Sequence, residues 1–220
     1  LIICVDCGTL SHQAIESLNE SDLIVLDHHL ASEILPKCYA IVNPNRQDEL
    51  GDLSHLCAAA VVFLCLVEMR RLLRLNAEES PDLLNMLDLV ALATVADVAP
   101  LVGVNRAFVR QGLKILSSRK RIGLAALSDQ VKIDQELSAY HLGFLLGPRL
   151  NAGGRIGKSD LGAQLLISRD LEAAKAMAER LDQLNFERRE LEKQIKEAAL
   201  EQALHQKSID SLAWAAGDSW

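Results

Sequence analysis

The sequence lacks the features that mark membrane and secreted proteins. Its longest apolar run, from Leu56 to Val67, holds two cysteines and ends at Glu68, which is too short to cross a bilayer. The chain opens directly on LIICVDCGT, so we expect no secretory signal and no membrane partner. It also has no low-complexity tract, and 50% hydrophobic with 24% charged residues predicts a globular protein.

Cysteines are few and follow no disulfide framework. The chain has five, an odd number, which favours a reducing compartment and therefore a cytoplasmic location. Cys4 and Cys7 form a C-x-x-C, the spacing of thioredoxin-like and zinc sites. Because the sequence has no second such pair and the first lies in an apolar, strand-like run, we favour small buried residues beside a site over a redox or zinc centre.

Positive charge is scarce overall, and the net charge of −7 argues against a nucleic-acid partner. The distribution of the charges indicates something different. Residues 1–100 have 5 Lys and Arg against 15 Asp and Glu, residues 101–170 have 11 against 5, and residues 171–220 have 7 against 10. A metal-dependent enzyme acting on phosphates needs an acidic part for cations and a basic part for anions, although unrelated surface charge would give the same counts.

Three short apolar runs predict a parallel sheet. The runs are LIICVD (1–6), DLIVLD (22–27) and YAIVNP (39–44), and helix-length segments separate them. Strands joined in this way pair in parallel and are covered by helices on both faces. We therefore expect an α/β fold with a parallel sheet covered by helices.

A helical part should follow the sheet. We expect a buried apolar helix over residues 53–73 and a long amphipathic connecting helix over residues 170–206. Further helices are predicted at 80–98, 105–117, 138–146 and 161–167. The stretch GPRLNAGGRIG (147–157), with four glycines and a proline, predicts a structured loop, and the last ten residues predict a strand that stops almost at once.

Carboxylates and imidazoles follow the predicted strands. Asp6 ends the first strand, and Asp27, His28 and His29 end the second; in parallel sheets, ligands gather at this edge. Together with Asp97 in ATVADVAPL these residues form a ligand set suited to a divalent metal such as Mn²⁺. Two ions about 3.5–4 Å apart would activate a water and stabilise a leaving oxygen in phosphoester hydrolysis.

Each of these groups alone has a simpler explanation as a helix cap, a solvated loop residue or a structural histidine. The adjacent histidines strengthen the metal hypothesis. Because successive side chains of an extended strand point to opposite sides, we expect the His28 and His29 rings to point apart, so that one core contact cannot satisfy both.

The glycine-rich stretch predicts an anion site. Arg149 and Arg155 offer planar forks for phosphate oxygens, Asn151 offers an amide, and the glycines let backbone N–H groups approach an anion. The alternative is a loop whose arginines cap helix ends. The run from Arg119 to Arg121 is a weaker signal, since three basic residues are usually a solvated turn, though they could touch a nucleic-acid backbone.

Taken in order, several stretches resemble the motifs of the DHH phosphoesterase family and, within it, its branch of bacterial single-strand-specific exonucleases. The stretches are VDCGT (5–9), LDHHL (26–30), VNPNR (42–46), LCAAAVVFLC (56–65), ATVADVAPLVGVNR (93–106) and GPRLNAGGRIG (147–157). They span nearly the whole chain. DHH alone is a weak motif, whereas its combination with TVADVAPL and GPRLNAGGR is highly specific.

The resemblance implies a 5′ to 3′ exonuclease that uses two Mn²⁺ or Mg²⁺ ions to degrade single-stranded DNA in repair and recombination. It also allows a single-strand-binding protein or a helicase as partner. By motif position, Asp6 would bridge the ions and His28 and Asp97 would bind one of them. His29 would lie near the scissile phosphate, and Asp27 would orient the histidines.

For the basic stretch, the resemblance implies contacts of Arg149, Asn151 and Arg155 with the DNA backbone or the surroundings of the metal site. It also divides the chain into a DHH catalytic domain (1–168), the connecting helix (169–207) and the truncated start of a DHH-associated domain (208–220).

The family's first motif, an aspartate-rich strand end before VDCGT, has no counterpart in this sequence. We therefore expect a core fragment with little or no nuclease activity. Two other hypotheses stay open: a DHH phosphoesterase that acts on oligonucleotides, cyclic dinucleotides or pyrophosphate, and a degenerate member that serves as a non-catalytic binding module.

Overall fold

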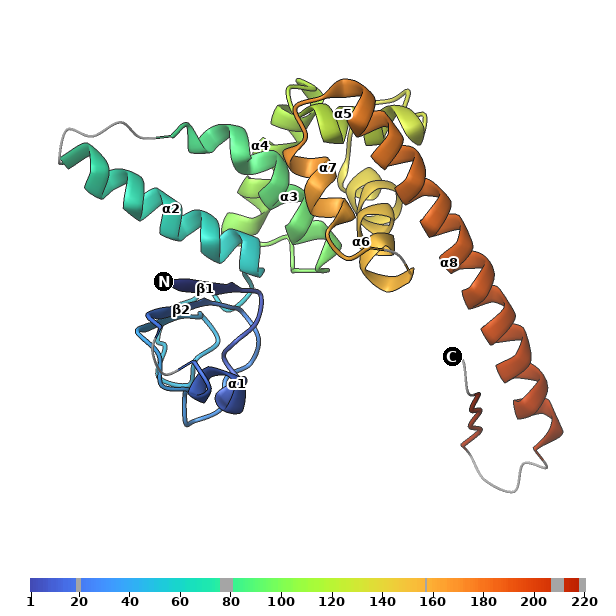
Figure 1. The fold of residues 1–220 in the computed structure, drawn as a ribbon, viewed down its shortest axis with the longest axis horizontal. Helices are drawn as coiled ribbons and strands as arrows, with labels where there is room; N and C mark the ends of the chain where they lie inside the picture. Colours follow the sequence, from blue (N-terminus) through green and yellow to red (C-terminus); the bar gives the residue numbers. More distant parts are fainter. Residues whose placement is uncertain (19–20, 76–80, 157, 207–211, 218–220) are drawn as a thin grey trace. The chain divides into compact units, whose positions relative to one another are not determined.

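The computed structural model describes residues 1–18, 21–75, 81–156, 158–206 and 212–217. The chain divides into two compact units (Figure 1). The first comprises Leu1–Lys120 and Ile133–Gly147, and the second comprises Arg121–Lys132 and Pro148–Trp220. Because helices and a small parallel sheet make up the chain, the predicted α/β class is confirmed.

The sheet of the first unit has three parallel strands. They are β1 (Ile2–Val5), β2 (Leu23–Leu26) and β3 (Ala40–Val42), side by side in that order. Val5 pairs with Leu26, and Leu26 pairs with Val42. Since the last residues of all three strands are in register, whatever follows each strand emerges at the same carboxyl edge.

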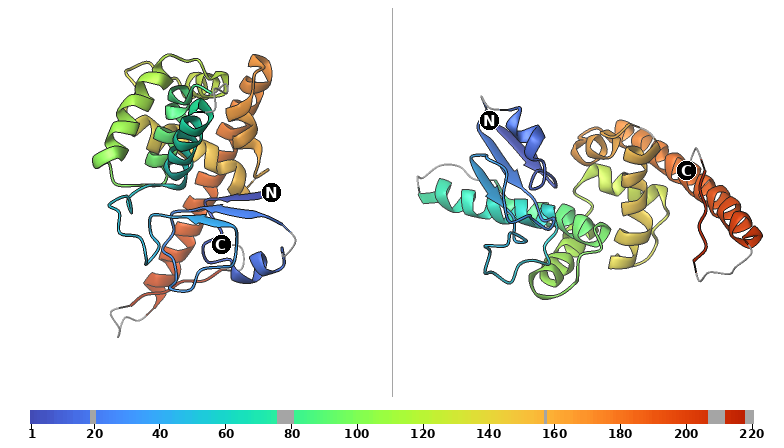
Figure 2. Two further views of the ribbon diagram at one scale, coloured as in Figure 1. Left: turned by 90° about the vertical axis from the view of Figure 1, so that its left-hand side faces the viewer. Right: turned by 90° about the horizontal axis from the view of Figure 1, so that it is seen from below.

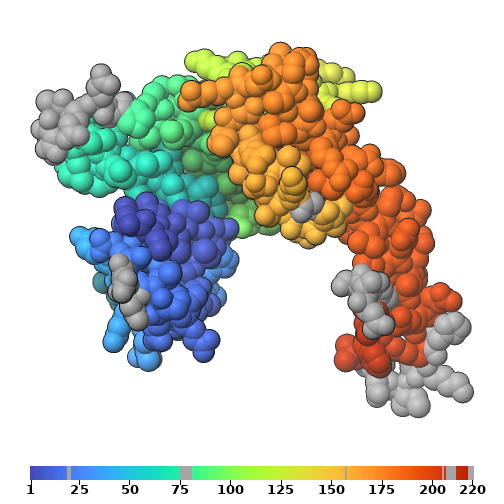
Figure 3. All heavy atoms as spheres, in the orientation of Figure 1, coloured from blue at the N-terminus to red at the C-terminus, as the bar shows by residue number. Residues whose placement is uncertain are grey.

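Helices pack on the sheet. The short α1 (His12–Glu16) contributes Ile15 to a small core with Leu23 and Val25 of β2. The helix α2 (Ala58–Leu75) contacts β1 and β2 and crosses the sheet in the view from below (Figure 2, right). In Figure 3 the blue atoms of the strands abut the teal atoms of α2.

The expectation that α2 is buried holds only for its first half. Ala60 and Val61 are buried, whereas Val67, Met69 and Leu72 are exposed. None of the described helices combines the length and the apolar character needed to cross a bilayer.

A helical layer completes the first unit. It consists of the 3₁₀ turn η1 (Leu83–Met86), α3 (Leu87–Ala96), α4 (Gly103–Ser117) and the π-helical η2 (His141–Leu146). A Cβ atom built on Gly112 of α4 would lie 2.2 Å from the Leu87 carbonyl oxygen and 2.4 Å from the Ala91 Cβ atom. Helices α3 and α4 therefore pack in backbone contact, at a distance that only glycine permits.

All the regular secondary structure among the described residues of the second unit is helical. It consists of α5 (Ile122–Gln130), α6 (Gly147–Ile156, whose first residue belongs to the first unit), α7 (Leu161–Ile167) and α8 (Leu171–His205). Its core includes the fully buried Leu165 of α7 and Leu181 and Leu184 of α8. The long helix predicted for 170–206 is confirmed.

The predicted loop at 147–157 is wrong, because α6 covers Gly147–Ile156. Pro148 lies in the first turn, where a helix tolerates it. Gly153 is buried, and a Cβ atom there would lie 3.3 Å from a methyl group of Leu181. Gly153 thus serves close packing, whereas a Cβ atom on Gly154 would meet no atom within 4 Å. Burial of Ala152 offsets the poor helix propensity of these glycines.

Three further expectations differ from the structure. Helix α5 was not predicted at all. The helix expected over 80–98 begins with the η1 turn, N-capped by Asp82, whose carboxylate accepts from the Leu84 backbone N–H at 3.1 Å; residues 76–80 lie outside the described part. The strand expected in the last ten residues is wrong for 212–217, which are irregular, and residues 211 and 218–220 lie outside the described part.

This C-terminal segment lies along the end of α8. The Gln206 side chain accepts from the Trp214 backbone N–H at 3.2 Å and donates to the Trp214 carbonyl. Gln202 makes the same pair of bonds with Ala216, at 3.2 and 3.0 Å. Two glutamine amides thus bind an extended backbone in the way a neighbouring strand would.

Candidate metal centre

The residues after the three strands meet at the carboxyl edge of the sheet. Asp6 follows β1, the triplet Asp27–His29 follows β2, and Asn43 follows β3. Asp6 has a positive φ of 61°, a left-handed conformation that aspartate tolerates better than most residues. The chain therefore turns sharply as soon as the first strand ends.

Three side chains form a cluster of candidate metal ligands. One ligand atom each from Asp6, His28 and His29 lies within 4.8 Å of the other two. His28 Nε2 is 3.2 Å from Asp6 Oδ1. One carboxylate oxygen and two imidazole nitrogens are donors that Mn²⁺ and other divalent first-row metals accept.

Asp97 approaches the cluster from the other side of the His28 ring. It is the C-cap of α3, and its Oδ2 lies 3.6 Å from His28 Nδ1. One ring nitrogen of His28 thus faces Asp6 and the other faces Asp97. Because an ion binds only one of these nitrogens, an ion beside Asp6 would leave Asp97 to orient the ring through Nδ1. The assignment of Asp97 as a direct ligand stays a prediction.

The segment that carries Asp97 is held firmly. Val98 has a φ of 56°, which is costly for a β-branched residue and recurs at functional sites. The buried Asn105 of α4 donates its amide to the carbonyls of His55, at 2.7 Å, and Pro100, at 3.0 Å. This loop therefore keeps a strained backbone next to the cluster.

Asp27 lies behind the histidines, buried and fully hydrogen-bonded. It accepts from the backbone N–H groups of Thr9 (3.0 Å), His28 (2.8 Å) and His29 (3.3 Å), and its Oδ1 is 2.8 Å from His29 Nδ1. Burial alone raises the pKa of this carboxyl, but the hydrogen bonds from His29, Thr9 and His28 outweigh it and hold the pKa well below its usual range. Asp27 is therefore a fixed anion that orients the loop and His29.

The expectation that the two histidine rings point apart is wrong. Their centroids are 4.6 Å apart with the rings tilted by 57°. Strand β2 ends at Leu26, so the alternation of a strand does not extend to the histidines. The hydrogen bond to Asp27 raises the pKa of His29 despite some desolvation. Because an ionised Asp27 cannot donate, His29 Nδ1 carries a proton and Nε2 is the nitrogen left for a ligand or substrate.

A polar network missed in the sequence supports the loop. Asn43 donates its amide to Thr9 Oγ1 at 3.0 Å and to the His29 carbonyl at 2.9 Å. Asn45 donates to the His28 carbonyl at 2.6 Å. Both asparagines belong to VNPNR, so the motif itself was the available signal, although nothing in the sequence disclosed its partners.

Gly8 completes the turn beneath the network. Its φ is 116°, and a Cβ atom there would lie 3.0 Å from both methyl groups of Val25. Only glycine tolerates both this positive φ and this close approach to Val25. The glycine in VDCGT therefore allows the turn that brings Thr9 close to Asp27.

The basic stretch belongs to the second unit and is not the loop that the sequence suggested. Arg149 Nε donates to Asp182 Oδ1 of α8 at 2.7 Å, and Gln130 of α5 approaches the other oxygen of that carboxylate at 3.3 Å. Arg149 thus ties α6 to α8. Asn151 and Arg155 are exposed on α6, and their contact with DNA stays a prediction.

The C-x-x-C pair takes no part in the cluster. Cys4 is half-buried and Cys7 is exposed, so the expectation of small buried residues is wrong for Cys7. Although the Cys7 side chain is exposed, partial desolvation of its thiol, followed by the nearby Cys4 and acidic groups, raises the pKa of Cys7, which disfavours the reactive thiolate. All five cysteines are free.

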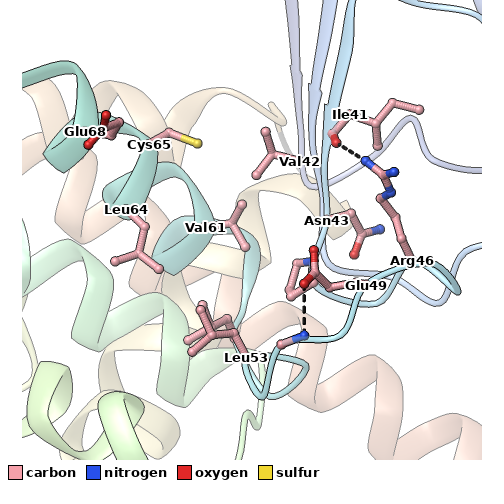
Figure 4. Close-up of a pocket in the computed structure, with 13 residues that line it drawn as sticks. Ile41, Val42, Asn43, Arg46, Glu49, Leu53, Val61, Leu64, Cys65 and Glu68 are labelled. Atoms are coloured by element: carbon pink, nitrogen blue, oxygen red, sulfur yellow. Dashed lines mark hydrogen bonds between the residues drawn. The ribbon is translucent and has the colours of Figure 1, made fainter. Parts of the chain in front are cut away.

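A separate cavity of about 390 Å³ opens between β3 with its following loop and α2 (Figure 4). Its walls are mainly apolar, and polar groups at the rim are already bonded: Arg46 donates to the Ile41 carbonyl at 2.9 Å, and Glu49 accepts from the Gly51 N–H at 2.9 Å. No member of the metal cluster lines it, so we assign it no part in the candidate site.

Taken together, the edge of the sheet fits a divalent metal. The three donors come from one carboxylate and two imidazoles, they converge within 4.8 Å, and the backbone that carries them is fixed by buried hydrogen bonds. Even if all three candidate donors bind one ion, further positions of that ion stay open for water or substrate, as catalytic metal sites require.

These features belong to a known class of protein domain, which has the sheet, the Asp27–His29 triplet and α3. The DHH family, N-terminal domain, matches residues 1–94, which include all of these features except the last residues of α3. Over these residues the chain is therefore similar to the DHH family.

Within that class, the relatives of the chain are RecJ exonucleases. The single-stranded-DNA-specific exonuclease RecJ of Dickeya dadantii is 41% identical over 202 residues, covering 87% of this chain and 35% of that protein. RecJ of Escherichia coli is 40% identical over 210 residues, covering 91% of this chain and 36% of that protein. The chain thus spans about a third of the length of the curated relatives it matches.

Solved structures that are similar to this chain are also RecJ exonucleases. RecJ of Thermus thermophilus in complex with Mn²⁺ superposes with a TM-score of 0.78 at 32% identity, covering 91% of this chain and 30% of that one. An exonuclease RecJ bound to manganese gives a TM-score of 0.79 at 32% identity, covering 91% and 50%. The fold of the chain is therefore similar to the corresponding part of these RecJ structures.

Proposed function

We propose that this chain carries the metal-binding core of an exonuclease that hydrolyses phosphodiester bonds of single-stranded DNA, from 5′ to 3′, in repair and recombination. The observation that carries the proposal is the convergence of Asp6, His28 and His29 within 4.8 Å at the carboxyl edge of the sheet. The relatives named as single-stranded-DNA-specific exonucleases support the substrate class. Direction and pathway rest on the resemblance to the family.

In this proposal Asp6 and His28 hold a divalent ion, and Asp97 either joins them or fixes the His28 ring. Bound Mn²⁺ or Mg²⁺ would supply a Lewis acid that polarises the phosphate and lowers the pKa of a water molecule. Two such ions are expected in the family, and Asp6, which is mostly exposed, has a free oxygen for a second.

His29 has a different role in the proposal. Its Nδ1–H donates to Asp27, so the ring has one orientation and its Nε2 is available to a phosphate or leaving oxygen. The side chain is 56% exposed, which leaves room for a substrate. A buried carboxylate that fixes the tautomer of a neighbouring imidazole is a recurrent arrangement in hydrolytic enzymes.

A basic surface supports a nucleic-acid substrate. Between residues 98 and 128 the sequence has six basic and no acidic residues. Arg106, Arg110 and Lys114, spaced four residues apart, are exposed on the face of α4 turned away from α3, and they form no ion pair within the described part of the chain. Such a row suits the phosphates of a DNA backbone. We propose the same kind of contact for Arg155 and Asn151.

The remaining parts of the proposal have narrower support. A cytoplasmic location fits five free thiols. A single-strand-binding protein or a helicase as partner rests on the resemblance alone.

Metal binding tests the core of the proposal. Titration of the chain with Mn²⁺, followed by electron paramagnetic resonance, should show a bound ion that His28→Ala removes. His12→Ala is the matched control, because His12 lies on α1 outside the cluster. Equal Mn²⁺ affinity of the His28 variant and the unaltered chain would refute the assignment.

Substrate choice separates the proposal from its alternatives. The polypeptide encoded by the complete reading frame is given 5′-phosphorylated single strands, duplex DNA, a cyclic dinucleotide and pyrophosphate, each with Mn²⁺. Release of mononucleotides from single strands supports the exonuclease. Hydrolysis confined to the small substrates would favour the other DHH phosphoesterases, and Mn²⁺ binding without hydrolysis would favour a binding module.

A further inference from the structure

Two aromatic rings lie stacked on the outer surface of the first unit. Tyr140 and Phe144 have ring centroids 5.1 Å apart and ring planes inclined by 28°. They are nevertheless 58% and 69% exposed. A stacked pair that leaves most of its area in water presents a flat apolar surface on which another ring can stack.

A buried histidine supports the Tyr140 ring of the pair. The edge of the Tyr140 ring meets the ring of His141, with centroids 5.7 Å apart and planes at 84°. His141 is buried, and its Nδ1 accepts from the backbone N–H of Ser138 at 3.0 Å and pairs with the Ser138 hydroxyl at 2.9 Å. This contact restricts the Tyr140 ring before binding, which reduces the conformational entropy that the ring would lose.

The helix that carries the pair packs beside the candidate metal centre. A Cβ atom on Gly143 would lie 3.2 Å from Val95 Cγ1, and one on Gly147 would lie 3.2 Å from the Cβ atom of Ala96. These two α3 residues directly precede Asp97. Val95 and Asp97 are two peptide units apart, at most about 8 Å between Cα atoms, so the pair lies within reach of a short strand bound at the cluster.

The charges near the pair favour bases over phosphates as its ligand. The segment that leads into η2 carries Asp134 and Glu136, both exposed, and these carboxylates repel phosphate groups. Stacking of a base on an aromatic ring needs no positive charge and tolerates any base.

We propose that Tyr140 and Phe144 form a stacking platform for bases of the single-stranded substrate next to the candidate metal centre. This inference rests on the proposed function. The platform would position the strand without reading its sequence, while the basic row of α4 contacts phosphates.

The test measures binding separately from hydrolysis. A short single strand with the fluorescent base 2-aminopurine is titrated with the chain in EDTA, and its anisotropy and fluorescence are recorded. Phe144→Ala should weaken binding about tenfold, the effect of losing one stacked base, and should abolish the quenching of 2-aminopurine. Phe144→Trp should retain both. Phe186→Ala, at a residue of α8 that is 59% exposed, is the control and should change neither.

A strand with abasic sites in place of its bases identifies what is recognised. If bases stack on the platform, the abasic strand binds the unaltered chain about tenfold more weakly, and Phe144→Ala weakens it no further. An equal loss for both strands would overturn base stacking in favour of a contact with the backbone. If Phe144→Ala binds the ordinary strand as tightly as the unaltered chain does, the stacking platform is overturned but the proposed function is not. If the unaltered chain does not bind the strand at all, both proposals are overturned.

Discussion

Replacing Asp27 by asparagine should destabilise the first unit strongly, although the two side chains have nearly the same shape. Asp27 is 1% exposed, and both of its oxygens accept hydrogen bonds. In asparagine one oxygen becomes an NH₂ group, which would face the backbone N–H of Thr9 or the donors on His28 and His29. At least one buried donor then loses its acceptor.

The magnitude follows from these contacts. A hydrogen bond to a charged group contributes roughly 1.5–3 kcal/mol, and an unsatisfied buried donor costs roughly 1–3 kcal/mol. Part of the loss is offset, because asparagine need not be desolvated as an ion. We therefore expect the free energy of unfolding to fall by about 2–4 kcal/mol.

Urea unfolding followed by circular dichroism, in EDTA so that metal binding does not contribute, measures this change. Asp48→Asn is the control, since Asp48 pairs with Arg46 in water and should have a much smaller effect. A loss below about 0.5 kcal/mol, the range of ordinary surface substitutions, would refute the reasoning.

At acidic pH, the free energies of unfolding of the unaltered chain and of the Asp27→Asn variant should become more similar. Because the hydrogen bonds hold the pKa of Asp27 below its usual range, the ionised carboxylate stabilises the fold above the unfolded pKa of about 3.9. That stabilisation is lost as the pH falls through the lower pKa of the folded state. The Asp27→Asn variant lacks this dependence, so its deficit should shrink below about pH 4. A deficit that stays constant there would contradict the role of the charge.

Three other substitutions test the packing, the backbone and the basic surface. Gly112→Ala should cost about 3 kcal/mol or more in urea unfolding, because its Cβ atom would lie 2.2 Å from the Leu87 carbonyl; a loss below about 1 kcal/mol would mean that α3 and α4 can separate. Val98→Gly should stabilise the chain by about 0.5–1 kcal/mol by removing left-handed strain from an exposed residue, whereas Val98→Ala should not, and equal effects would exclude strain. Arg110→Glu should weaken single-strand binding and its salt dependence without altering Mn²⁺ affinity, and unchanged DNA affinity would remove α4 from the proposed interface.

The strands, their parallel pairing and the edge that gathers polar groups could be predicted from the sequence. Apolar runs that end in Asp6 and Asp27 specify strands, and parallel pairing brings their ends together. The contacts behind the histidines could not be predicted, because Asn43 and Thr9 are 34 positions apart and no local pattern joins them. The sequence also could not show which nitrogen of the His28 ring faces Asp6 and which faces Asp97, because this depends on where α3 ends.

The stretch at 147–157 shows why its amino-acid composition led to the wrong prediction of a loop. Glycine and proline usually mark loops, but here Gly153 gives Leu181 room to approach and Pro148 lies where a helix accepts it. Both effects depend on neighbours distant in sequence. The same holds for Arg149, whose partner Asp182 lies 33 positions away.

The C-terminal segment bound by Gln202 and Gln206 decides what optical methods will detect. The chain has two tryptophans: Trp214, which is exposed on this segment, and Trp220, outside the described residues. The fluorescence of Trp214 therefore reports on the end of α8, and unfolding of the sheet or loss of a metal ion can leave it unchanged. Neither tryptophan belongs to the first unit, so Phe144→Trp would give this unit a tryptophan of its own, at the stacking platform.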